Sequence, residues 1–108
     1  MKQKLTIPQL NEVKFICISQ ILYLNALSNY TEINLISGNK ITCSKTLKYF
    51  EQKLVDTHLI RIHDKYIINT EFVISISKNR TWVLRLGNDL MFPISDSYKS
   101  EVIAFFDL

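Results

Sequence analysis

Residues 30–44 read YTEINLISGNKITCS, and this stretch contains both strands and the turn of a β-hairpin. Ile33 and Leu35 alternate with polar neighbours, a period of two that is typical of a strand with one buried face. The sequence SGN at residues 37–39 is a turn sequence, and a second apolar alternation comes after it at residues 41–44. We therefore predict an antiparallel hairpin at this point of the chain.

The same alternation recurs before and after this hairpin. Ile, Val and Thr together account for 27 of the 108 residues, and side chains that branch at Cβ fit a pleated sheet better than a helix. The segments that we predict as strands are 4–7, 13–18, 21–27, 30–36, 41–44, 59–63, 66–68, 72–77, 81–86 and 90–94. The sequence thus predicts a mainly β protein of small packed antiparallel sheets.

The length of the chain allows one domain with one substantial core. Pro8 and Asn11 separate the first apolar segment from the rest of the chain, so we expect an N-terminal arm, residues 1–11, and a core, residues 12–108. Three strand faces near the C-terminus are expected to be buried: Phe72, Ile74 and Ile76; Trp82, Leu84 and Leu86; and Leu90, Phe92 and Ile94. Trp82 is therefore predicted to lie in the core rather than on a surface that stacks on bases.

Two segments change to helical spacing. Leu47, Phe50 and Leu54 recur at intervals of three and four residues, with Ser44 or Thr46 as the N-cap, which predicts a short internal helix. A second helix is predicted near the C-terminus, where Tyr98, Val102 and Phe105 have helical spacing and come after Ser95, Asp96 and Ser97, three residues that favour N-cap positions.

Nothing in the sequence favours an enzyme or a cofactor site. The chain has two glycines, Gly38 and Gly87, so no glycine-rich phosphate loop can be built. His58 and His63 have no neighbouring nucleophile, and the carboxylates are scattered singly. The two cysteines lack the spacing of a metal site. We expect no enzymatic activity, no cofactor and no metal.

The cysteines and the apolar runs also bear on location. No apolar run approaches the length of a membrane span, and residues 1–4 lead into no signal sequence, so we expect a cytoplasmic protein without a membrane partner. Cys17 lies between two isoleucines and is expected to be buried. We predict that Cys17 and Cys43 are reduced thiols, with a redox switch as the alternative.

The chain is mildly basic, with a formal net charge of +3. The excess lies in the first half, where lysines cluster at Lys40, Lys45, Lys48 and Lys53. Such a cluster permits a nucleic-acid partner, but it is equally compatible with a solvated helix face.

Three segments carry many short polar side chains beside predicted strands. They are residues 25–31 (NALSNYT), 61–69 (RIHDKYIIN) and 93–99 (PISDSYK). Each of them alone is compatible with an ordinary turn, and each could also contact base edges or phosphates.

Taken in order, these segments resemble the LytTR DNA-binding domain, the output module of response regulators of the LytR and AlgR type. The resemblance covers residues 13–100. The residues that carry it are ILYLNA at 21–26, NYT at 29–31, SKTL at 44–47, Phe50-Glu51 with Leu54, RIH at 61–63 with Tyr66, Ile67 and Asn69, and PIS at 93–95 with Tyr98.

The resemblance implies a β sandwich whose loops enter successive major grooves of DNA at direct repeats about one helical turn apart. The partners implied are double-stranded DNA, a second copy on the same DNA and, in a full-length two-component regulator of transcription, a receiver domain. The DNA contacts implied are Asn29, Tyr30 and Thr31 in one loop, His63, Asp64 and Lys65 in the second, and Asp96, Ser97 and Lys99 in the third. Arg61, Tyr66 and Asn69 are implied as the scaffold of the second loop.

Two aspartates depart from the family's pattern. Asp64 stands where the family usually has a basic residue or an amide, and Asp96-Ser97 stands where arginine is frequent. Because an aspartate repels phosphate, we expect Lys45, Lys48, Lys65 and Lys99 to supply most of the attraction for DNA. Asp96 also has a structural explanation, as a cap of the terminal helix. The alternative function is a non-enzymatic protein-interaction module of the same fold with weakened DNA affinity.

Overall fold

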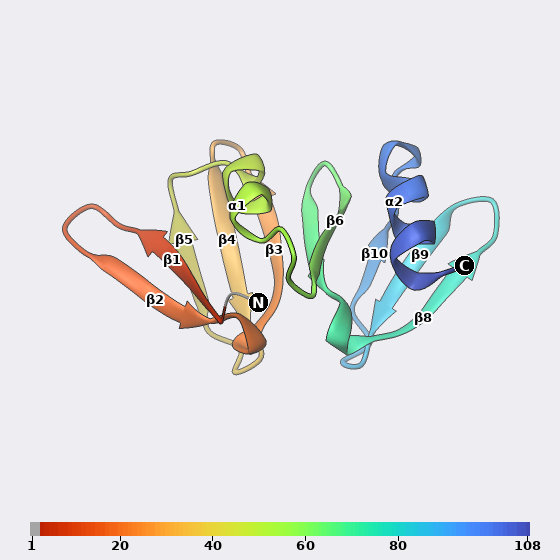
Figure 1. The fold of residues 1–108 in the computed structure, drawn as a ribbon, viewed down its shortest axis with the longest axis horizontal. Coiled ribbons are helices and arrows are strands. Elements are labelled where there is room, and N and C mark those ends of the chain that lie inside the picture. Colours follow the sequence, from red (N-terminus) through yellow and green to blue (C-terminus); the bar gives the residue numbers. More distant parts are fainter. Residues whose placement is uncertain (1–2) are drawn as a thin grey trace.

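The computed structural model describes residues 3–108 (Figure 1). Along this part of the chain the elements are β1 (Lys4–Pro8), β2 (Val13–Cys17), the 3-10 turn η1 (Ile18–Gln20), β3 (Ile21–Leu27), β4 (Tyr30–Leu35), β5 (Lys40–Cys43), α1 (Leu47–Lys53), β6 (Leu59–His63), β7 (Tyr66–Asn69), the 3-10 turn η2 (Thr70–Phe72), β8 (Val73–Lys78), β9 (Trp82–Leu86), β10 (Met91–Pro93) and α2 (Asp96–Phe106). The mainly β prediction with two helices is confirmed.

The strands form three antiparallel sheets. The order is β1-β2 in the first sheet, β5-β4-β3-β7-β6 in the second and β10-β9-β8 in the third. Figure 1 shows them side by side along an elongated molecule, with the β1–β2 hairpin at one end and the third sheet at the other. The Cα atoms extend 45 Å along the long axis and 24 Å along the other two.

Both faces of the five-stranded sheet are covered. On β7, Ile67 belongs to a first core with Leu24 and Phe50, whereas Ile68 belongs to a second core with Leu84. Successive residues of a strand point to opposite faces, so two covered faces require two adjacent apolar residues. This explains why the central strands read as nearly continuous apolar runs.

The first strand belongs to the body of the protein and is not a free arm. β1 pairs with β2 from Lys4↔Cys17 to Pro8↔Val13, and the side chains of Leu5 and Ile7 are fully buried in the first core. The expected arm is therefore corrected for residues 4–8. Pro8 ends the strand, as expected, but the chain folds back to pair with it.

The third sheet departs from the predicted alternation at two places. An irregularity in register between Val73 and Ser75 leaves Ile74 54% exposed, because a bulge shifts which residues face the core. Leu90 is also exposed, because it lies in the turn between β9 and β10 and not in β10 itself. In this turn the Asp89 amide donates to the carbonyl of Leu86. Leu84, Leu86, Phe92 and Ile94 are buried as predicted.

The two helices begin differently. Thr46 caps α1, because its hydroxyl accepts a hydrogen bond from the Tyr49 amide at 3.2 Å. Ser95 occupies the N-cap of α2 without a side-chain bond. Asp96 is the first helical residue, and its carboxylate lies 3.2 Å from Lys99 Nζ. The prediction that Asp96 caps this helix is therefore wrong.

The apolar face of α2 also differs from the predicted one. Val102 is fully buried, but Phe105 is 44% exposed and Phe106 packs against the second core instead. The helix continues for one residue beyond the predicted face, to Phe106, and then ends with Asp107 in the left-handed conformation.

The cysteines occupy different environments. Cys17 is exposed, contrary to prediction, because its register opposite Lys4 puts it on the outer face of the β1–β2 hairpin. Cys43 is buried, and its thiol lies 3.1 Å from the carbonyl oxygen of Pro8. Neither forms a disulfide in the structure.

We therefore expect unequal thiol reactivity in the native protein. Cys17 should react rapidly with iodoacetamide, whereas Cys43 should react only after denaturation, because its sulfur is covered. Mass spectrometry before and after adding denaturant measures both rates. Recovery of a Cys17–Cys43 bridge from freshly lysed cells would contradict the prediction of reduced thiols.

Candidate nucleic-acid interface

Each of the three polar segments that the sequence singled out places a turn or the start of a helix at one long edge of the molecule. Figure 1 shows along its upper edge the β3–β4 turn, the loop before α1, the β6–β7 turn, the β8–β9 turn and the start of α2. Antiparallel strands of similar length return their turns to the same edge at every second connection. We call this row of five connections the loop edge.

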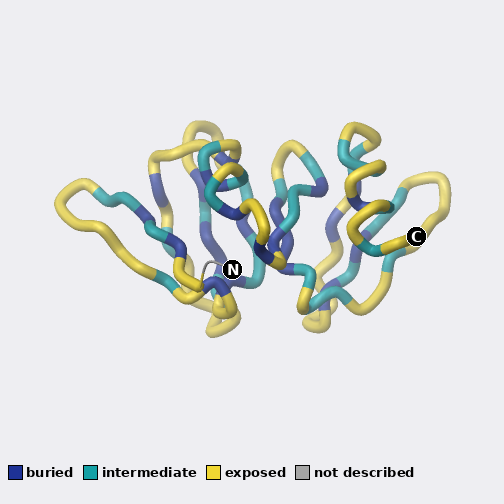
Figure 2. The backbone as a smooth tube through the Cα atoms, viewed as in Figure 1, coloured by how far each residue is buried: buried dark blue, intermediate teal, exposed yellow. Residues whose placement is uncertain are grey.

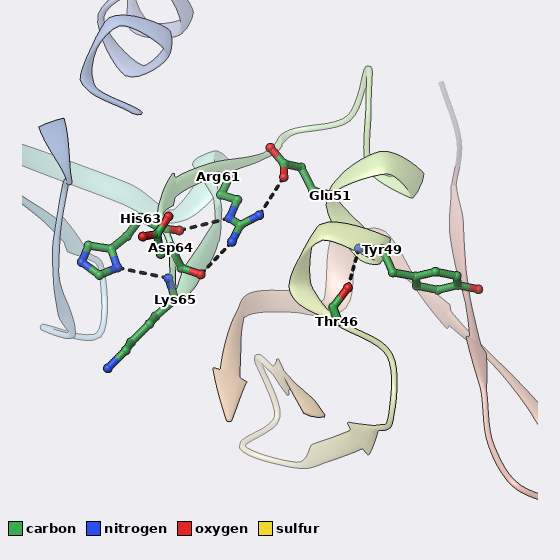
Figure 3. A network of polar contacts seen from close by, with 7 residues as sticks. All are labelled: Thr46, Tyr49, Glu51, Arg61, His63, Asp64 and Lys65. Carbon is green, nitrogen blue, oxygen red and sulfur yellow. Dashed lines mark hydrogen bonds and ion pairs between the residues drawn. The ribbon is translucent and has the colours of Figure 1, made fainter. Parts of the chain in front are cut away.

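Arg61 fixes the shape of the β6–β7 turn (Figure 3). Its Nε donates to the carbonyl oxygen of His63 at 3.2 Å, and its Nη2 donates to the carbonyl oxygen of Asp64 at 2.7 Å. Its Nη1 pairs with Glu51 Oε1 of α1 at 2.9 Å. The planar guanidinium thus ties two carbonyls of the turn to α1, and Arg61 has the scaffold role that the resemblance implied.

Arg61 also contacts an aromatic side chain of α2. The Tyr98 ring of α2 lies 5.5 Å from the guanidinium. Burial raises the pKa of the Tyr98 phenol above its ordinary value, and the nearby cation of Arg61 opposes that shift. The phenol therefore stays protonated beside the cation, and the turn is held from both helices.

Within the turn, the side chains divide into inner and outer ones. His63 is half-buried, and its Nδ1 accepts a hydrogen bond from the Lys65 amide at 3.1 Å. A neutral imidazole that accepts at Nδ1 carries its proton on Nε2, which remains a donor. Asp64 and Lys65 are exposed. The turn therefore presents a carboxylate, an ammonium group and an imidazole donor on a braced backbone.

The other two scaffold residues have different partners. Tyr66 packs between the rings of His63 and Phe92, with centroid distances of 5.4 and 5.0 Å, and so supports the turn. Asn69 lies at the opposite end of β7, where its Nδ2 donates to the carbonyl of Ile21 at 2.8 Å. Asn69 therefore fastens β7 to β3 and does not hold the second loop.

The β3–β4 turn exposes two of its three predicted contact residues. Asn29 and Tyr30 are exposed, and the turn depends on Ser28 at a positive φ of 54°. Thr31 is fully buried, because the alternation of β4 places it on the same face as Ile33. Its hydroxyl donates to the carbonyl of Lys45 at 2.8 Å. The expected DNA contact by Thr31 is corrected: Thr31 connects this turn to the loop before α1.

That loop and the first turn of α1 carry two of the predicted phosphate contacts. Lys45 and Lys48 are both exposed, and the ammonium group of Lys45 lies 5.3 Å from the centroid of the Tyr49 ring. Because Thr31 holds the Lys45 carbonyl, the backbone that carries this cation is fixed relative to the β3–β4 turn.

The third loop has less free positive charge than expected. Lys99 pairs with Asp96, and its Nζ also lies 5.1 Å from the centroid of the Trp82 ring. Asp96 and Ser97 are exposed. Trp82 is half-buried and packs against the second core rather than lying inside it, so the prediction that Trp82 lies in the core holds in part.

Since Trp82 is only half-buried, Trp82→Ala should destabilise the fold by about 1–2 kcal/mol, less than the 3–5 kcal/mol of a fully buried aromatic residue. Thermal unfolding measures this, and Trp82→Phe should recover most of the loss. An unchanged melting temperature together with lost DNA binding would instead make Trp82 a DNA contact.

A cleft of about 280 Å³ separates the second loop from the third, with His63, Arg80, Trp82, Ser95 and Asp96 among its lining residues. Arg80, exposed in the β8–β9 turn, was not predicted as a contact. The Asn79-Arg80 pair was assigned only as a turn, and nothing local distinguishes a turn arginine that lines a cleft from a solvated one. The structure adds Arg80 to the cations of the loop edge.

Comparison with known proteins agrees with this geometry. The family model described as the LytTr DNA-binding domain matches residues 11–107. The chain belongs to the LytTR family. This is a family of DNA-binding domains and not of enzymes.

Two similar proteins show the extent of the similarity. The sensory transduction protein LytT of Bacillus subtilis (strain 168) is 25% identical over 103 residues, which cover 94% of this chain and 42% of that protein. The chain thus spans less than half of this curated relative. A solved LytTr DNA-binding domain from Bacillus cereus has the same fold, with a TM-score of 0.82, 24% identity and full coverage of both chains. No helix within residues 3–108 is long and apolar enough to cross a membrane.

Proposed function

We propose that this LytTR domain is the sequence-specific output domain of a bacterial transcriptional regulator in the cytoplasm. Its loop edge would enter successive major grooves of direct-repeat sites, and a receiver domain would control it in the full-length protein. The observation that carries the proposal is the braced β6–β7 turn, which presents polar side chains on the same edge as Asn29, Tyr30 and Lys45.

The charges on this edge set the expected strength of binding. Lys45, Lys48, Lys65 and Arg80 are exposed cations, whereas Lys99 is already paired with Asp96. If about four phosphates are neutralised, the logarithm of the affinity should fall against the logarithm of salt with a slope of about −3 to −4. A gel-shift titration against the region upstream of the protein's own gene, at several salt concentrations, measures this slope.

Two single substitutions separate phosphate contacts from base reading. Lys65→Ala should weaken binding to cognate and random DNA alike and flatten the salt slope by about one unit. Asn29→Ala should cost about 1–2 kcal/mol on cognate DNA and little on random DNA, because base contacts carry the sequence information. Arg85→Ala removes a cation near the β9–β10 turn, away from the loop edge, and should change neither.

A second candidate is a protein-interaction module of the same fold. The exposed carboxylates of Asp64 and Asp96 favour it, since both lie within the proposed DNA contacts. Absence of salt-dependent DNA binding by the wild-type chain would reject the first proposal in favour of this one.

A further inference from the structure

A pocket of about 400 Å³ lies on the edge of the molecule opposite the loop edge. Both 3-10 turns, η1 and η2, contribute to its walls, and both lie along the lower edge in Figure 1. Figure 2 shows buried segments next to exposed ones at these turns, so the pocket reaches from the surface toward the interior. We call this hollow the junction pocket; its lining residues include Cys17, Ile18, His58, Asn69, Glu71 and Phe72.

The junction pocket lies where the three sheets are connected. Cys17 ends β2 of the first sheet, Asn69 ends β7 of the second, and Phe72 leads into β8 of the third. Within residues 3–108 the chain passes from the second sheet to the third once, through η2. A molecule in the pocket therefore contacts the covalent link between the two parts of the protein that share the loop edge.

Hydrogen bonds within the protein fix the walls of the pocket. Asn69 is 1% exposed, its Nδ2 donates to the carbonyl of Ile21 at 2.8 Å, and its Oδ1 accepts from the Glu71 amide at 3.0 Å. The hydroxyl of Thr70 donates to the carbonyl of His58 at 2.6 Å. Because these bonds exist before a ligand arrives, binding pays little for ordering the site.

The lining combines apolar surface with one carboxylate. Ile18 and Phe72 are apolar, and the Nε2 of His58 lies 3.3 Å from Oε1 of Glu71. Of the described residues that line the pocket, none is a lysine or an arginine. Pockets for small molecules are typically about 300–1,000 Å³ in volume and mainly apolar, with a few polar groups that orient the ligand. Both the volume and the lining of the junction pocket fit this description.

We propose that the junction pocket binds a small organic cation, an apolar body that carries an ammonium or amidinium group. The apolar body lies against Ile18 and Phe72, and the cationic group donates to the carboxylate of Glu71. The residues that line the pocket belong to none of the five connections of the loop edge. The site is therefore separate from the candidate nucleic-acid interface, and the inference goes beyond the proposed function.

The test uses three probes with the same ring system: naphthylmethylamine, naphthylmethanol and naphthylacetate. The side chains of Glu71 and His58 are 59% and 48% exposed, so water screens the ion pair with the ligand. The amine should therefore bind about fivefold more tightly than the alcohol, a ratio typical of a partly exposed ion pair, and the acetate should bind most weakly. Isothermal titration measures the affinities, and the amine should shift the amide NMR signals of residues 17–19, 58 and 69–72.

Three variants identify the groups responsible. Glu71→Gln should remove the preference for the amine and leave the affinity for the alcohol unchanged. Glu12→Gln, at an exposed carboxylate in the β1–β2 turn, is the matched control and should change neither. Ser19→Trp, at an exposed position that lines the pocket, should fill it and abolish binding of all three probes. Thermal unfolding verifies that each variant is folded.

Cys17 provides a second measurement in the unmodified protein, because its thiol lines the pocket and is exposed. A bound ligand covers the thiol. At about ten times its dissociation constant, the amine should slow alkylation of Cys17 by iodoacetamide about tenfold, in proportion to the fraction of protein left free.

Tighter binding of the acetate than of the amine would overturn the proposal in favour of an anion held by His58. Equal affinities that Glu71→Gln leaves unchanged would also overturn it, since they would show apolar adsorption only. The same holds for an absence of binding by every probe, or for NMR shifts elsewhere in the chain. None of these results depends on DNA, so the proposed function is tested separately.

Discussion

Replacing Arg61 by alanine is expected to weaken specific DNA binding strongly and to destabilise the fold. The substitution removes the donors to the carbonyls of His63 and Asp64 and leaves Glu51 without its cation. The Arg61 side chain is only 13% exposed, so water replaces its bonds poorly. Each hydrogen bond to a charged group contributes about 1.5–3 kcal/mol. With three such bonds lost, we expect cognate affinity to fall about 100-fold. The melting temperature should drop by about 20 °C, since 1 kcal/mol shifts it by about 4–8 °C in a domain of this size.

Two further variants distinguish bracing from charge. Arg61→Lys keeps the cation but cannot bond two carbonyls and a carboxylate at once, so it should recover part of the stability and little of the specificity. Glu51→Gln keeps an acceptor for Nη1 while the turn contacts remain, and it should bind DNA nearly normally. Isothermal titration and thermal unfolding measure both effects. Normal cognate binding by the Arg61→Ala variant would show that the β6–β7 turn needs no brace.

The positions of the strands were predictable because each strand has its own alternation of apolar and polar residues. The alternation at residues 30–44 and the SGN turn were sufficient for β4 and β5, and Gly38 indeed adopts a positive φ of 93°. The N-terminal arm was mistaken because a break in the pattern at Pro8 was taken as separation from the core. A hairpin produces the same break. Only pairing with β2 shows that Leu5 and Ile7 are buried.

The errors in the third sheet and in α2 have one physical origin. A bulge at Val73 and Ser75 moves one residue out of phase, and no local property of the sequence encodes where it falls. Similarly, Phe105 and Phe106 are both apolar neighbours, so the direction of the helix against the second core decides which of them is buried. Tertiary packing decides such choices between adjacent apolar residues.

The candidate interface was predictable at the level of segments more than of side chains. The resemblance gave the order of the loops, but burial decides what each residue can touch. Thr31 belongs to the same motif as Asn29 and Tyr30, yet strand alternation turns it inward. Arg80 lies outside every motif, and only the fold brings it to the cleft beside His63. Contacts proposed from sequence therefore need the burial pattern of the strands that flank each turn.

Asp64 is the residue at which the charge argument can be tested most directly. Its backbone carbonyl accepts from Arg61, so the brace depends on the main chain and not on the carboxylate. The carboxylate itself is exposed at the loop edge and would repel phosphate. Asp64→Arg can therefore reverse the charge without removing the scaffold.

We expect Asp64→Arg to raise affinity for any duplex about thirtyfold. Changing a repulsive charge into an attractive one near a phosphate alters the interaction by about 2 kcal/mol in water-exposed surroundings, and the salt slope should steepen by about one unit. Glu71→Arg makes a comparable charge change in η2, away from the loop edge (Figure 1), and should have a much smaller effect. Titration of cognate and random DNA at two salt concentrations decides the role of Asp64. Tighter random binding with weaker cognate binding would show that Asp64 reads a base, since a carboxylate can accept from cytosine N4. In that case the carboxylate would contribute to specificity instead of weakening the affinity.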